Sequence, residues 1–442
     1  MPQELENLTF FIQTFGCQMN ESDSERIAGI LHRAGATKAA RPEDGDIVIV
    51  NTCAVRKKAE EKFYSYIGRL TQIKKKKPVQ IGIVGCVAQL RGLELLGKKH
   101  SVGFVLGPDN YGELPEILKK TMAEKHISTT WSPEWRETPP DLILRESSVS
   151  AYVPVMEGCN NFCAYCVVPF TRGQEKFRPL PLILGELNDL SSKGFKEIQL
   201  LGQNVNCYRD PKSGKSFTVL LKTASEVEGI EWIRFLTSHP KNFTAEIAQT
   251  MQESKKICRH LHLPLQSGST SILKKMKRGY TQEKYLEKIS YLRQLMPEIS
   301  LSTDIIVGFP GETEKDFEET LAVLRNVRFA NIFSFRYSPR PLTRASELED
   351  DISQEEKRRR LEEVQKLQKE IQLENHRRQV GRVLKVLCLG PSKRTPYLYA
   401  GRNEGNQVVN FISPESCIGK FIDVRITGFG PYSLHGERTN AS

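Results

Sequence analysis

The sequence predicts an α/β protein made of three domains. From residue 8 to about 341, apolar strands alternate with amphipathic helices, and after that the pattern changes to short strands separated by turn residues. We expect an N-terminal open parallel α/β sheet over residues 8–125 and a central partial (β/α)6 barrel over 145–375. A small all-β barrel is expected over 377–440. A stretch rich in proline and polar residues, 130–148, is typical of a linker.

In the first predicted domain, three apolar strands each end at a cysteine: Cys17, Cys53 and Cys86. Ligands of open parallel sheets bind beyond the carboxyl ends of the strands, so these thiols should converge although they stand 36 and 33 residues apart. A lone cysteine after a strand is more often a buried apolar residue than a ligand. Three of them in register instead suggest a three-thiol metal cluster.

Helix signals divide the rest of the chain. Ser and Asp side chains at 22–25 predict the start of the first helix, because such side chains cap helix N-termini. A basic helix is expected from about 57 to 75. A charged helix with one apolar stripe is expected over 355–376, where it would pack along the barrel and hold the last domain away from it.

The chain is organised around residues 157–173, where Cys159, Cys163 and Cys166 stand at a C-x3-C-x2-C spacing after an apolar strand. A 4Fe–4S cluster has four irons, so three thiolates leave one iron open to a ligand that is not protein. The alternative is a structural zinc site, which normally needs four Cys or His ligands, usually as two short pairs. The nearest downstream histidine is His239. Ligand count therefore favours an open iron–sulfur cluster.

Six strands are expected in the central barrel, and polar side chains follow most of them. These are Gln203, Asn204, Ser238, His239, Gln266, Ser267, Thr303, Asp304 and Arg336. Polar groups at the C-terminal ends of barrel strands are typical of an active site. His260 and His262 share one face of a strand without a local carboxylate, so we expect them to be structural or substrate-facing.

The charge of the chain suits a polyphosphate partner. The net charge is +11, and the segment from 377 to 442 alone holds ten basic and four acidic residues. Tyr397, Tyr399 and Phe411 stand among these charges, so aromatic faces could stack bases while Arg and Lys track phosphates. The N-terminus does not resemble a signal peptide, and no apolar run approaches the roughly 18–20 residues of a membrane span. We expect a cytoplasmic protein without a membrane partner.

Four further cysteines carry no motif: Cys207, Cys258, Cys388 and Cys417. In a large chain with ten cysteines and no export signal, metal ligands and buried thiols are expected before disulfides. We expect these four to be isolated buried thiols.

Nearly the whole chain resembles the methylthiotransferase family of radical S-adenosylmethionine (SAM) enzymes. The motifs match in order at 14–20, 51–56, 84–89, 158–166, 201–206, 237–240, 262–268 and 303–313. Gln-Met-Asn after Cys17 and Ala-Val-Arg after Cys53 resemble the branch that acts on isopentenyladenosine next to the tRNA anticodon. The alternatives are the branches for threonylcarbamoyladenosine in tRNA and for an aspartate of a ribosomal protein. A non-catalytic iron–sulfur RNA-binding protein is the alternative of another class.

The resemblance implies an N-terminal methylthiotransferase domain, a radical SAM core and a C-terminal TRAM RNA-binding domain. It implies that Cys17, Cys53 and Cys86 hold an auxiliary 4Fe–4S cluster, and that the other three motif cysteines hold the cluster that binds SAM. One SAM would methylate a sulfur on the auxiliary cluster. A second would yield the radical that activates carbon 2 of the adenine, where methylthio is inserted. Gly202 and Gln203 stand where related cores bind the SAM amino group.

The implied partners are the tRNA anticodon stem-loop carrying isopentenyladenosine, a reductant such as flavodoxin or ferredoxin, and a sulfur donor. Two stretches depart from the family. Residues 341–343 carry a leucine where the family usually has a glycine after proline, and 173–178 varies a commoner arginine-rich version. Both departures concern local substrate contacts and leave the six thiols unchanged.

Overall fold

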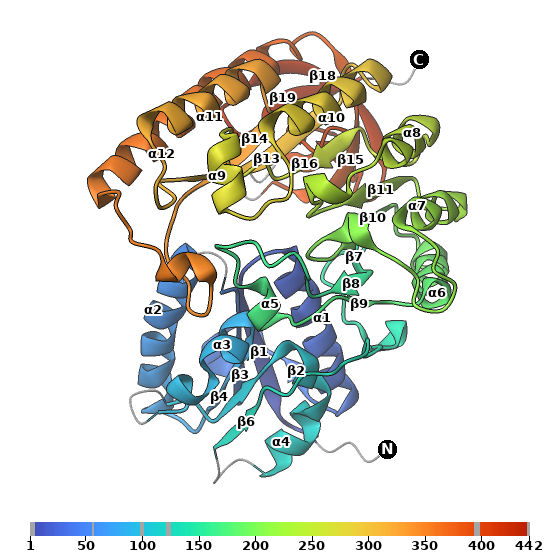
Figure 1. Ribbon diagram of the computed structural model, residues 1–442. Helices are drawn as coiled ribbons and strands as arrows, with labels where there is room; N and C mark the ends of the chain where they lie inside the picture. Colours follow the sequence, from blue (N-terminus) through green and yellow to red (C-terminus); the bar gives the residue numbers. More distant parts are fainter. Residues whose placement is uncertain (1–4, 55–56, 98–100, 121–124, 393–397, 440–442) are drawn as a thin grey trace.

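The computed structural model describes residues 5–54, 57–97, 101–120, 125–392 and 398–439. The N-terminal sheet and its helices occupy the lower half of Figure 1, and the central and C-terminal barrels occupy the upper half. The sheets are a six-stranded parallel sheet, two three-stranded parallel sheets, a two-stranded ribbon and a closed barrel. The predicted α/β architecture in three parts is therefore confirmed.

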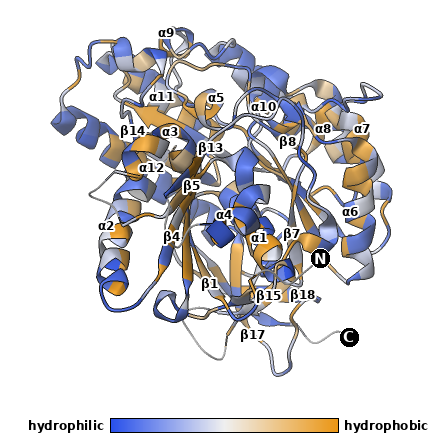
Figure 2. Cartoon of the chain, turned by 90° about the horizontal axis from the view of Figure 1, so that it is seen from below, coloured by the Kyte–Doolittle hydropathy of each residue, from blue (hydrophilic) through white to orange (hydrophobic). Residues whose placement is uncertain are grey.

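The N-terminal domain is a parallel sheet in the order β2-β1-β3-β4-β5-β6. All residues of β3, β4 and β5 are buried, because α2 and α3 cover one face of the sheet and α1 and α4 the other. Figure 2 shows these strands as hydrophobic ribbons inside the domain. The elements are β1 (Thr9–Phe15), α1 (Gln18–Arg33), β2 (Thr37–Lys38), β3 (Ile47–Thr52), α2 (Lys57–Lys74), β4 (Gln80–Gly85), α3 (Cys86–Leu95), β5 (Phe104–Leu106), α4 (Leu114–Lys120) and β6 (His126–Ser128).

Helix α1 begins earlier than predicted. Cys17 occupies the N-cap position, and its backbone N–H donates to Oδ1 of Asn20 at 3.3 Å, so the helix starts directly after β1. Ser22 and Asp23 are buried inside the helix. The prediction that they cap it was wrong, because a cysteine with an asparagine three residues later takes that position.

The central barrel holds six parallel strands in two sheets, β11-β10-β7 and β12-β13-β14, joined by a bridge between Ile233 and Ile257. This is the predicted partial (β/α)6 barrel, with its helices outside (Figure 1). Its elements are β7 (Ser150–Pro154), β8 (Met156–Glu157), α5 (Val168–Thr171), β9 (Lys176–Phe177), α6 (Leu180–Ser192), β10 (Glu197–Leu201), α7 (Phe217–Glu226), β11 (Trp232–Phe235), α8 (Ala245–Glu253), β12 (His260–His262), α9 (Thr270–Lys275), α10 (Gln282–Leu295), β13 (Ser300–Val307), α11 (Glu314–Val327), β14 (Asn331–Arg336) and α12 (Gln354–Arg377).

The C-terminal domain is a closed barrel in the order β15-β16-β17-β19-β18. Its strands are β15 (Val383–Pro391), β16 (Tyr399–Asn403), β17 (Val408–Ile412), β18 (Phe421–Phe429) and β19 (Leu434–Arg438). The sequence predicted only the first four. Strand β19 carries a single buried apolar side chain, Leu434, and an internal glycine, so it lacks the apolar alternation that marks a strand. Among the helices in the described part of the chain, none is long and apolar enough to span a bilayer.

The C-terminal barrel rests directly on the central one. Arg234 of β11 donates to the backbone carbonyls of Asn403 and Glu404, both at 2.8 Å. Trp232 meets Phe421 edge-on, with ring centroids 4.8 Å apart. The expectation that α12 holds this barrel away was therefore wrong. The helix does pack along the central barrel as expected, on β14 and α11, and it also contacts β18 of the C-terminal barrel.

The departure from the family at residue 342 carries backbone strain. Leu342 has a φ of 67°, in the left-handed region that disfavours L-residues by roughly 1–2 kcal/mol. Its side chain is 65% exposed, so little apolar burial offsets the strain.

We expect Leu342→Gly to stabilise the protein by about 0.5–1 kcal/mol, because the relief of strain exceeds the entropy that glycine returns to the unfolded chain. Thermal unfolding of the two proteins measures the difference. Leu348→Gly is the matched control, since Leu348 lies in the same connection at a φ of −80°, where glycine should destabilise. A lower unfolding midpoint for Leu342→Gly would contradict the expectation.

Candidate functional site

The structure brings the six motif cysteines into two groups at the edge where the N-terminal domain meets the central barrel. One group follows the carboxyl ends of β1, β3 and β4, and Gly85, at a φ of 87°, makes the turn that places its third member at the start of α3. The other group lies in the loop between β8 and α5. Electrostatic interactions link the members of each group, which are Cys17, Cys53 and Cys86, and Cys159, Cys163 and Cys166.

The first group favours a thiolate. A hydrogen bond from Cys53 and backbone N–H groups, with Arg172 nearby, lowers the pKa of Cys17 to about 6 against the opposing effect of burial. Burial raises the pKa of Cys86, although Arg172 donates to its sulfur. Because thiolates are the form that binds metal, one member of this group is already suited to ligation near neutral pH.

The loop of the second group is held in a strained shape. Gly158 has a φ of 79°, and its N–H donates to Oε1 of Gln203 at 2.6 Å. Phe162 in the same loop has a positive φ although it is not glycine, and so do Thr237 and Gln266 in the neighbouring loops after β11 and β12. Such conformations cost of order 1–3 kcal/mol each and are typical of sites that the surrounding structure holds in place.

Two donors point at Cys163. Nη1 of Arg278 donates to its Sγ at 3.3 Å, and Nε2 of His239 lies 4.0 Å away. Nδ1 of His239 accepts the N–H of Lys241 at 3.1 Å, which leaves the proton on Nε2. Burial lowers the pKa of His239 to about 2, so the ring is neutral.

Arg278 is a buried cation without an acidic partner in the described structure. Its other N–H groups donate to the carbonyl of Pro264 and the hydroxyl of Tyr280. Burial would lower its pKa, and although ionised Tyr165, Tyr280 and Cys163 would raise it, burial also raises the pKa of both tyrosines, so they are neutral near pH 7 and do not balance the charge. A buried charge is costly unless an opposite charge stands beside it. An anionic, thiolate-bound cluster at Cys163 would supply that charge, so these residues fit such a group.

The spacing of the thiols differs from that of a zinc site. Over the described ranges, no group of three or more His, Cys, Asp and Glu side chains is spaced for a single metal ion. A 4Fe–4S cluster is wider than one ion, so its thiolates stand further apart than zinc ligands do. Ligand count, three thiols without a fourth Cys or His nearby in the sequence, remains the ground for preferring a cluster to zinc.

The remaining cysteines are only partly as predicted. Cys258 is an isolated buried thiol. Cys388 and Cys417 are buried but lie in contact, with their sulfurs 3.3 Å apart, so the prediction of isolation was wrong for them. Closure of the C-terminal barrel brings them together, which sequence spacing did not reveal. Cys207 is half-buried and lies near Glu175 and Cys159, and is not isolated either.

Polar atoms lie ready at the strand ends beside the cluster loop. Oδ1 of Asn204 and Oγ of Ser238 are buried without a hydrogen-bond partner among the described residues. Buried polar atoms are normally satisfied, so these two suggest a bound polar ligand. Thr303 and Ser267, in contrast, are buried and bonded to their own surroundings, which is a structural role.

A polar and aromatic wall lines the inside of the barrel. Nδ1 of His262 shares a hydrogen bond with Oγ of Ser302 at 3.0 Å, and its Nε2 lies 3.6 Å from Oδ1 of Asp304. The ring of Phe333 meets His262 edge-on, with centroids 5.8 Å apart, and remains 41% exposed. The adjacent Ile305 is buried in the core. An exposed aromatic ring beside polar side chains is suited to a planar, hydrogen-bonding ligand.

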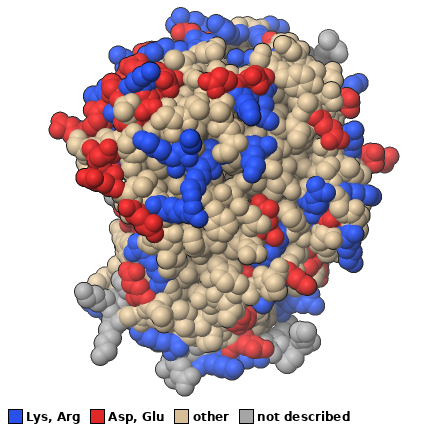
Figure 3. Space-filling view, viewed as in Figure 1, with Lys and Arg blue, Asp and Glu red and all other residues tan. Residues whose placement is uncertain are grey.

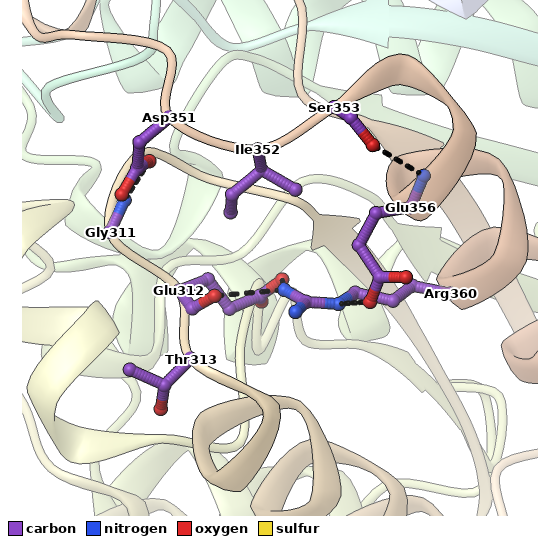
Figure 4. Close-up of a pocket in the computed structure, with 8 residues that line it drawn as sticks. All are labelled: Gly311, Glu312, Thr313, Asp351, Ile352, Ser353, Glu356 and Arg360. Carbon is purple, nitrogen blue, oxygen red and sulfur yellow. Dashed lines mark hydrogen bonds and ion pairs between the residues drawn. The ribbon is translucent and has the colours of Figure 1, made fainter.

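A pocket of about 460 Å³ between the loop after β13 and the start of α12 lies away from the thiols. Figure 4 shows that its charged side chains are paired with one another or bonded to the backbone. Arg360 bonds Glu312 at 2.8 Å and Glu356 at 2.7 Å, and the N–H of Gly311 donates to Asp351. The bonds across this pocket hold the start of α12 to the loop after β13, which is a structural role.

Of the aromatic residues predicted to stack bases, Phe411 is not available for stacking. Phe411 is fully buried, and Tyr399 stacks on it with ring centroids 6.2 Å apart. Tyr397 lies outside the described residues. Alternation along a strand does not tell which face of a small barrel is the core, so the prediction was wrong for Phe411, while for half-buried Tyr399 it stays a prediction.

Sequence reasoning also missed Arg172 and Arg278, which contact cysteine sulfurs. Only the place of Arg172 at the end of the 157–173 stretch could have drawn attention to it.

Three family models match the chain: "Uncharacterized protein family UPF0004" at 9–107, "Radical SAM superfamily" at 153–324 and "TRAM domain" at 377–438. A protein from Chlorobium luteolum is 45% identical over 98% of both chains. One from Thermodesulfovibrio yellowstonii is 44% identical, covering 97% of this chain and 98% of its own. Both are named tRNA-2-methylthio-N(6)-dimethylallyladenosine synthase. The chain belongs to this synthase family.

Membership of the synthase family agrees with the architecture. The central barrel is a radical SAM domain, and the C-terminal barrel is a TRAM domain. A radical SAM methyltransferase, TsrM from Kitasatospora setae, has a similar fold, with a TM-score of 0.55 and 13% identity over 77% of this chain and 75% of its own. This likeness concerns the fold alone.

We expect Arg278→Met to stabilise the protein prepared without iron by about 1 kcal/mol or more, because it removes a buried cation that has no acidic partner. The same change should weaken retention of the cluster at Cys163. Thermal unfolding of iron-free protein and iron content after desalting measure the two effects. Arg234→Met is the control, since this arginine is paired with Glu197 at 2.6 Å and its loss should destabilise by about 3–5 kcal/mol. Equal destabilisation by both variants would refute the interpretation.

Proposed function

We propose that the protein is a radical SAM tRNA methylthiotransferase that inserts a methylthio group at carbon 2 of N6-isopentenyladenosine next to the anticodon. The proposal rests on relatives named for that product, which are 44% and 45% identical to this chain over nearly its full length. Their name belongs to the isopentenyl branch, which disfavours threonylcarbamoyladenosine or a ribosomal-protein aspartate as the substrate. The three-thiol loop and the matched radical SAM domain disfavour a non-catalytic iron–sulfur RNA-binding protein.

We assign the thiols of the N-terminal domain to an auxiliary 4Fe–4S cluster and those of the barrel loop to the cluster that binds SAM. Bound there, the clusters would supply the electron that cleaves SAM and the sulfur that is inserted. The chain's own part is to hold the thiolates, place the substrate and exclude water. Cys86 from the first group and Cys163 from the second each receive an arginine N–H, at 3.4 Å and 3.3 Å.

SAM is proposed to bind along the strand ends at Gly202 and Gln203. A Cβ atom at position 202 would stand 2.6 Å from the Met156 side chain, so only glycine fits there without a shift. Gln203 fixes the backbone at Gly158, directly before the thiols. The unpartnered oxygen atoms of Asn204 and Ser238 are then available to the polar groups of SAM.

The adenine is proposed to enter the barrel and lie on the wall formed by His262, Asp304 and Phe333. Chemistry at carbon 2 of a base requires that the base leave its stack, and extruded bases are held by aromatic faces and by hydrogen bonds to their edges. Phe333 offers the face, while His262 and Asp304 offer polar atoms beside it.

Binding of tRNA is proposed to use the TRAM domain together with the basic surface near the end of the central barrel through which the adenine would enter. Figure 3 shows Lys and Arg side chains gathered in the middle of the face viewed in Figure 1, at the level of α9 and the junction below it. Lys274 and Lys275 of α9 and the adjacent Lys277 are exposed. A reductant such as flavodoxin or ferredoxin would deliver the electron. We propose a cytoplasmic enzyme with domains at 8–125, 145–375 and 377–440.

Changing Cys17, Cys53 or Cys86 singly to alanine should abolish sulfur insertion but leave reductive cleavage of SAM. Mass spectrometry of nucleosides from treated tRNA and assay of 5′-deoxyadenosine measure the two steps. Iron should fall from about eight per chain to about four, since each cluster holds four. Cys258→Ala is the control, because this buried thiol belongs to neither group. About four irons in the unchanged, anaerobically reconstituted protein would overturn the assignment.

Changing Phe333 to alanine should lower kcat/KM for the tRNA about 5- to 150-fold, because one stacked base gains about 1–3 kcal/mol from an aromatic face. The SAM cleavage that occurs without tRNA should be unchanged. Leu182→Ala, which removes an exposed apolar side chain from the outer helix α6, is the control. Unchanged kcat/KM in Phe333→Ala would exclude this wall as the base site.

A further inference from the structure

A network of buried charges joins the N-terminal domain to both ends of the barrel loop that carries the second thiol group. It holds three acidic and three basic side chains, so its charges cancel, and none is more than 12% exposed. The N-terminal domain contributes Asp23, Arg26 and Asp109, and the barrel domain contributes Glu157, Arg172 and Lys176.

The ion pairs of this network cross the domain boundary. Arg26 lies 3.4 Å from Glu157, and Lys176 lies 2.5 Å from Asp109 and 3.7 Å from Glu157. Glu157 stands two residues before the first thiol of the barrel loop, and Arg172 follows the short helix that ends the loop. The network therefore fixes the position of the loop relative to the other domain.

Arg172 of the barrel domain contacts two side chains of the N-terminal domain, Asp23 and Cys86. Its side chain is 2% exposed and forms a bidentate pair with Asp23, whose Oδ1 lies 3.4 Å from Nη1. Its Nε donates to Sγ of Cys86 at 3.4 Å. A residue of the radical SAM domain thus donates a hydrogen bond to a thiol of the N-terminal group.

Such a donor has a definite electronic effect. Hydrogen bonds to the sulfur atoms of an iron–sulfur cluster are among the factors that set its reduction potential. A donor and a positive charge stabilise the more negative, reduced state, and so raise the potential. Asp23 keeps the planar guanidinium in one orientation, so that Nε faces the sulfur. Lysine could not serve both partners with the same geometry.

We propose that Arg172 is a positioning residue that holds Cys86, and with it the auxiliary cluster, against the radical SAM domain and raises the reduction potential of that cluster from across the domain boundary. This rests on the proposed function, because it requires Cys86 to be a cluster ligand. Arg278 has the corresponding place at Cys163, but it comes from the same domain as its thiol. Among the described residues, only the first thiol group receives a hydrogen bond to sulfur from the other domain.

The test compares Arg172→Gln with the unchanged protein, both full-length and carrying both clusters. Midpoint potentials are measured by redox titration followed by electron paramagnetic resonance. The signal of the auxiliary cluster is identified in a variant with Cys159, Cys163 and Cys166 changed to alanine. We expect the auxiliary potential to shift to a more negative value and the other to stay unchanged. The methylthio product formed per 5′-deoxyadenosine should fall.

Arg178→Gln is the matched control. Arg178 is also buried and pairs with Glu137 and Glu186, but it contacts no thiol in the described structure. Unchanged potentials in Arg172→Gln, or an equal shift in Arg178→Gln, would overturn the proposal. Selective loss of the auxiliary cluster from Arg172→Gln would support it. If that variant does not fold, Arg172→Lys replaces it, with a smaller shift of the same sign expected. If the protein without any substitution holds only one cluster after anaerobic reconstitution, the proposed function itself is refuted.

Discussion

The arrangement of the molecule depends on buried ion pairs between two domains that each present thiols at the ends of parallel strands. Apolar contact is non-directional and would allow the domains to slide. Buried pairs such as Arg172 with Asp23 add little net stability, but breaking one costs about 3–5 kcal/mol. They therefore penalise every other docking geometry. Glu157 and Arg172 lie on either side of the barrel thiols, so the same contacts fix the distance between the two groups.

Positive charge next to sulfur recurs in both groups, in two different forms. Arg172 is compensated by Asp23, so its place is stable whether or not metal is present. Arg278 has no carboxylate beside it in the described structure and is bonded to Pro264, Tyr280 and the Cys163 sulfur. The pair of Arg172 and Asp23 fixes the contact between the two domains. Arg278, in contrast, gains a balancing negative charge only when an anion is bound at the thiols. A buried cation without a carboxylate is consistent with an anionic group at the thiols, and the oxygens of Asn204 and Ser238, which lack partners among the described residues, are consistent with a polar ligand.

Local patterns in the sequence predicted the parallel sheets, and the register of parallel strands predicted that Cys17, Cys53 and Cys86 meet. Most of the wrong predictions concern contacts between residues far apart in the sequence, which form only when a barrel closes or two domains dock. Phe411 was predicted to face a ligand, but barrel closure turns it into the core, where half-buried Tyr399 stacks on it. Contact between Cys388 and Cys417 needs the same closure. The role of Arg172 depends on docking between domains, which leaves no periodic signal in the chain. The predicted start of helix α1 was wrong for a local reason, because the N-cap is Cys17 and cysteine is an unusual cap.

The seat of the TRAM domain on the barrel has a mechanical consequence. Arg234 bonds the turn after β16, and Trp232 packs edge-on against Phe421 beside it, so polar and aromatic contacts together hold the two barrels to each other. If tRNA binds the TRAM domain as proposed, this joint sets the distance between the bound RNA and the interior of the central barrel. A base could then enter the barrel only if its distance along the RNA matched that spacing.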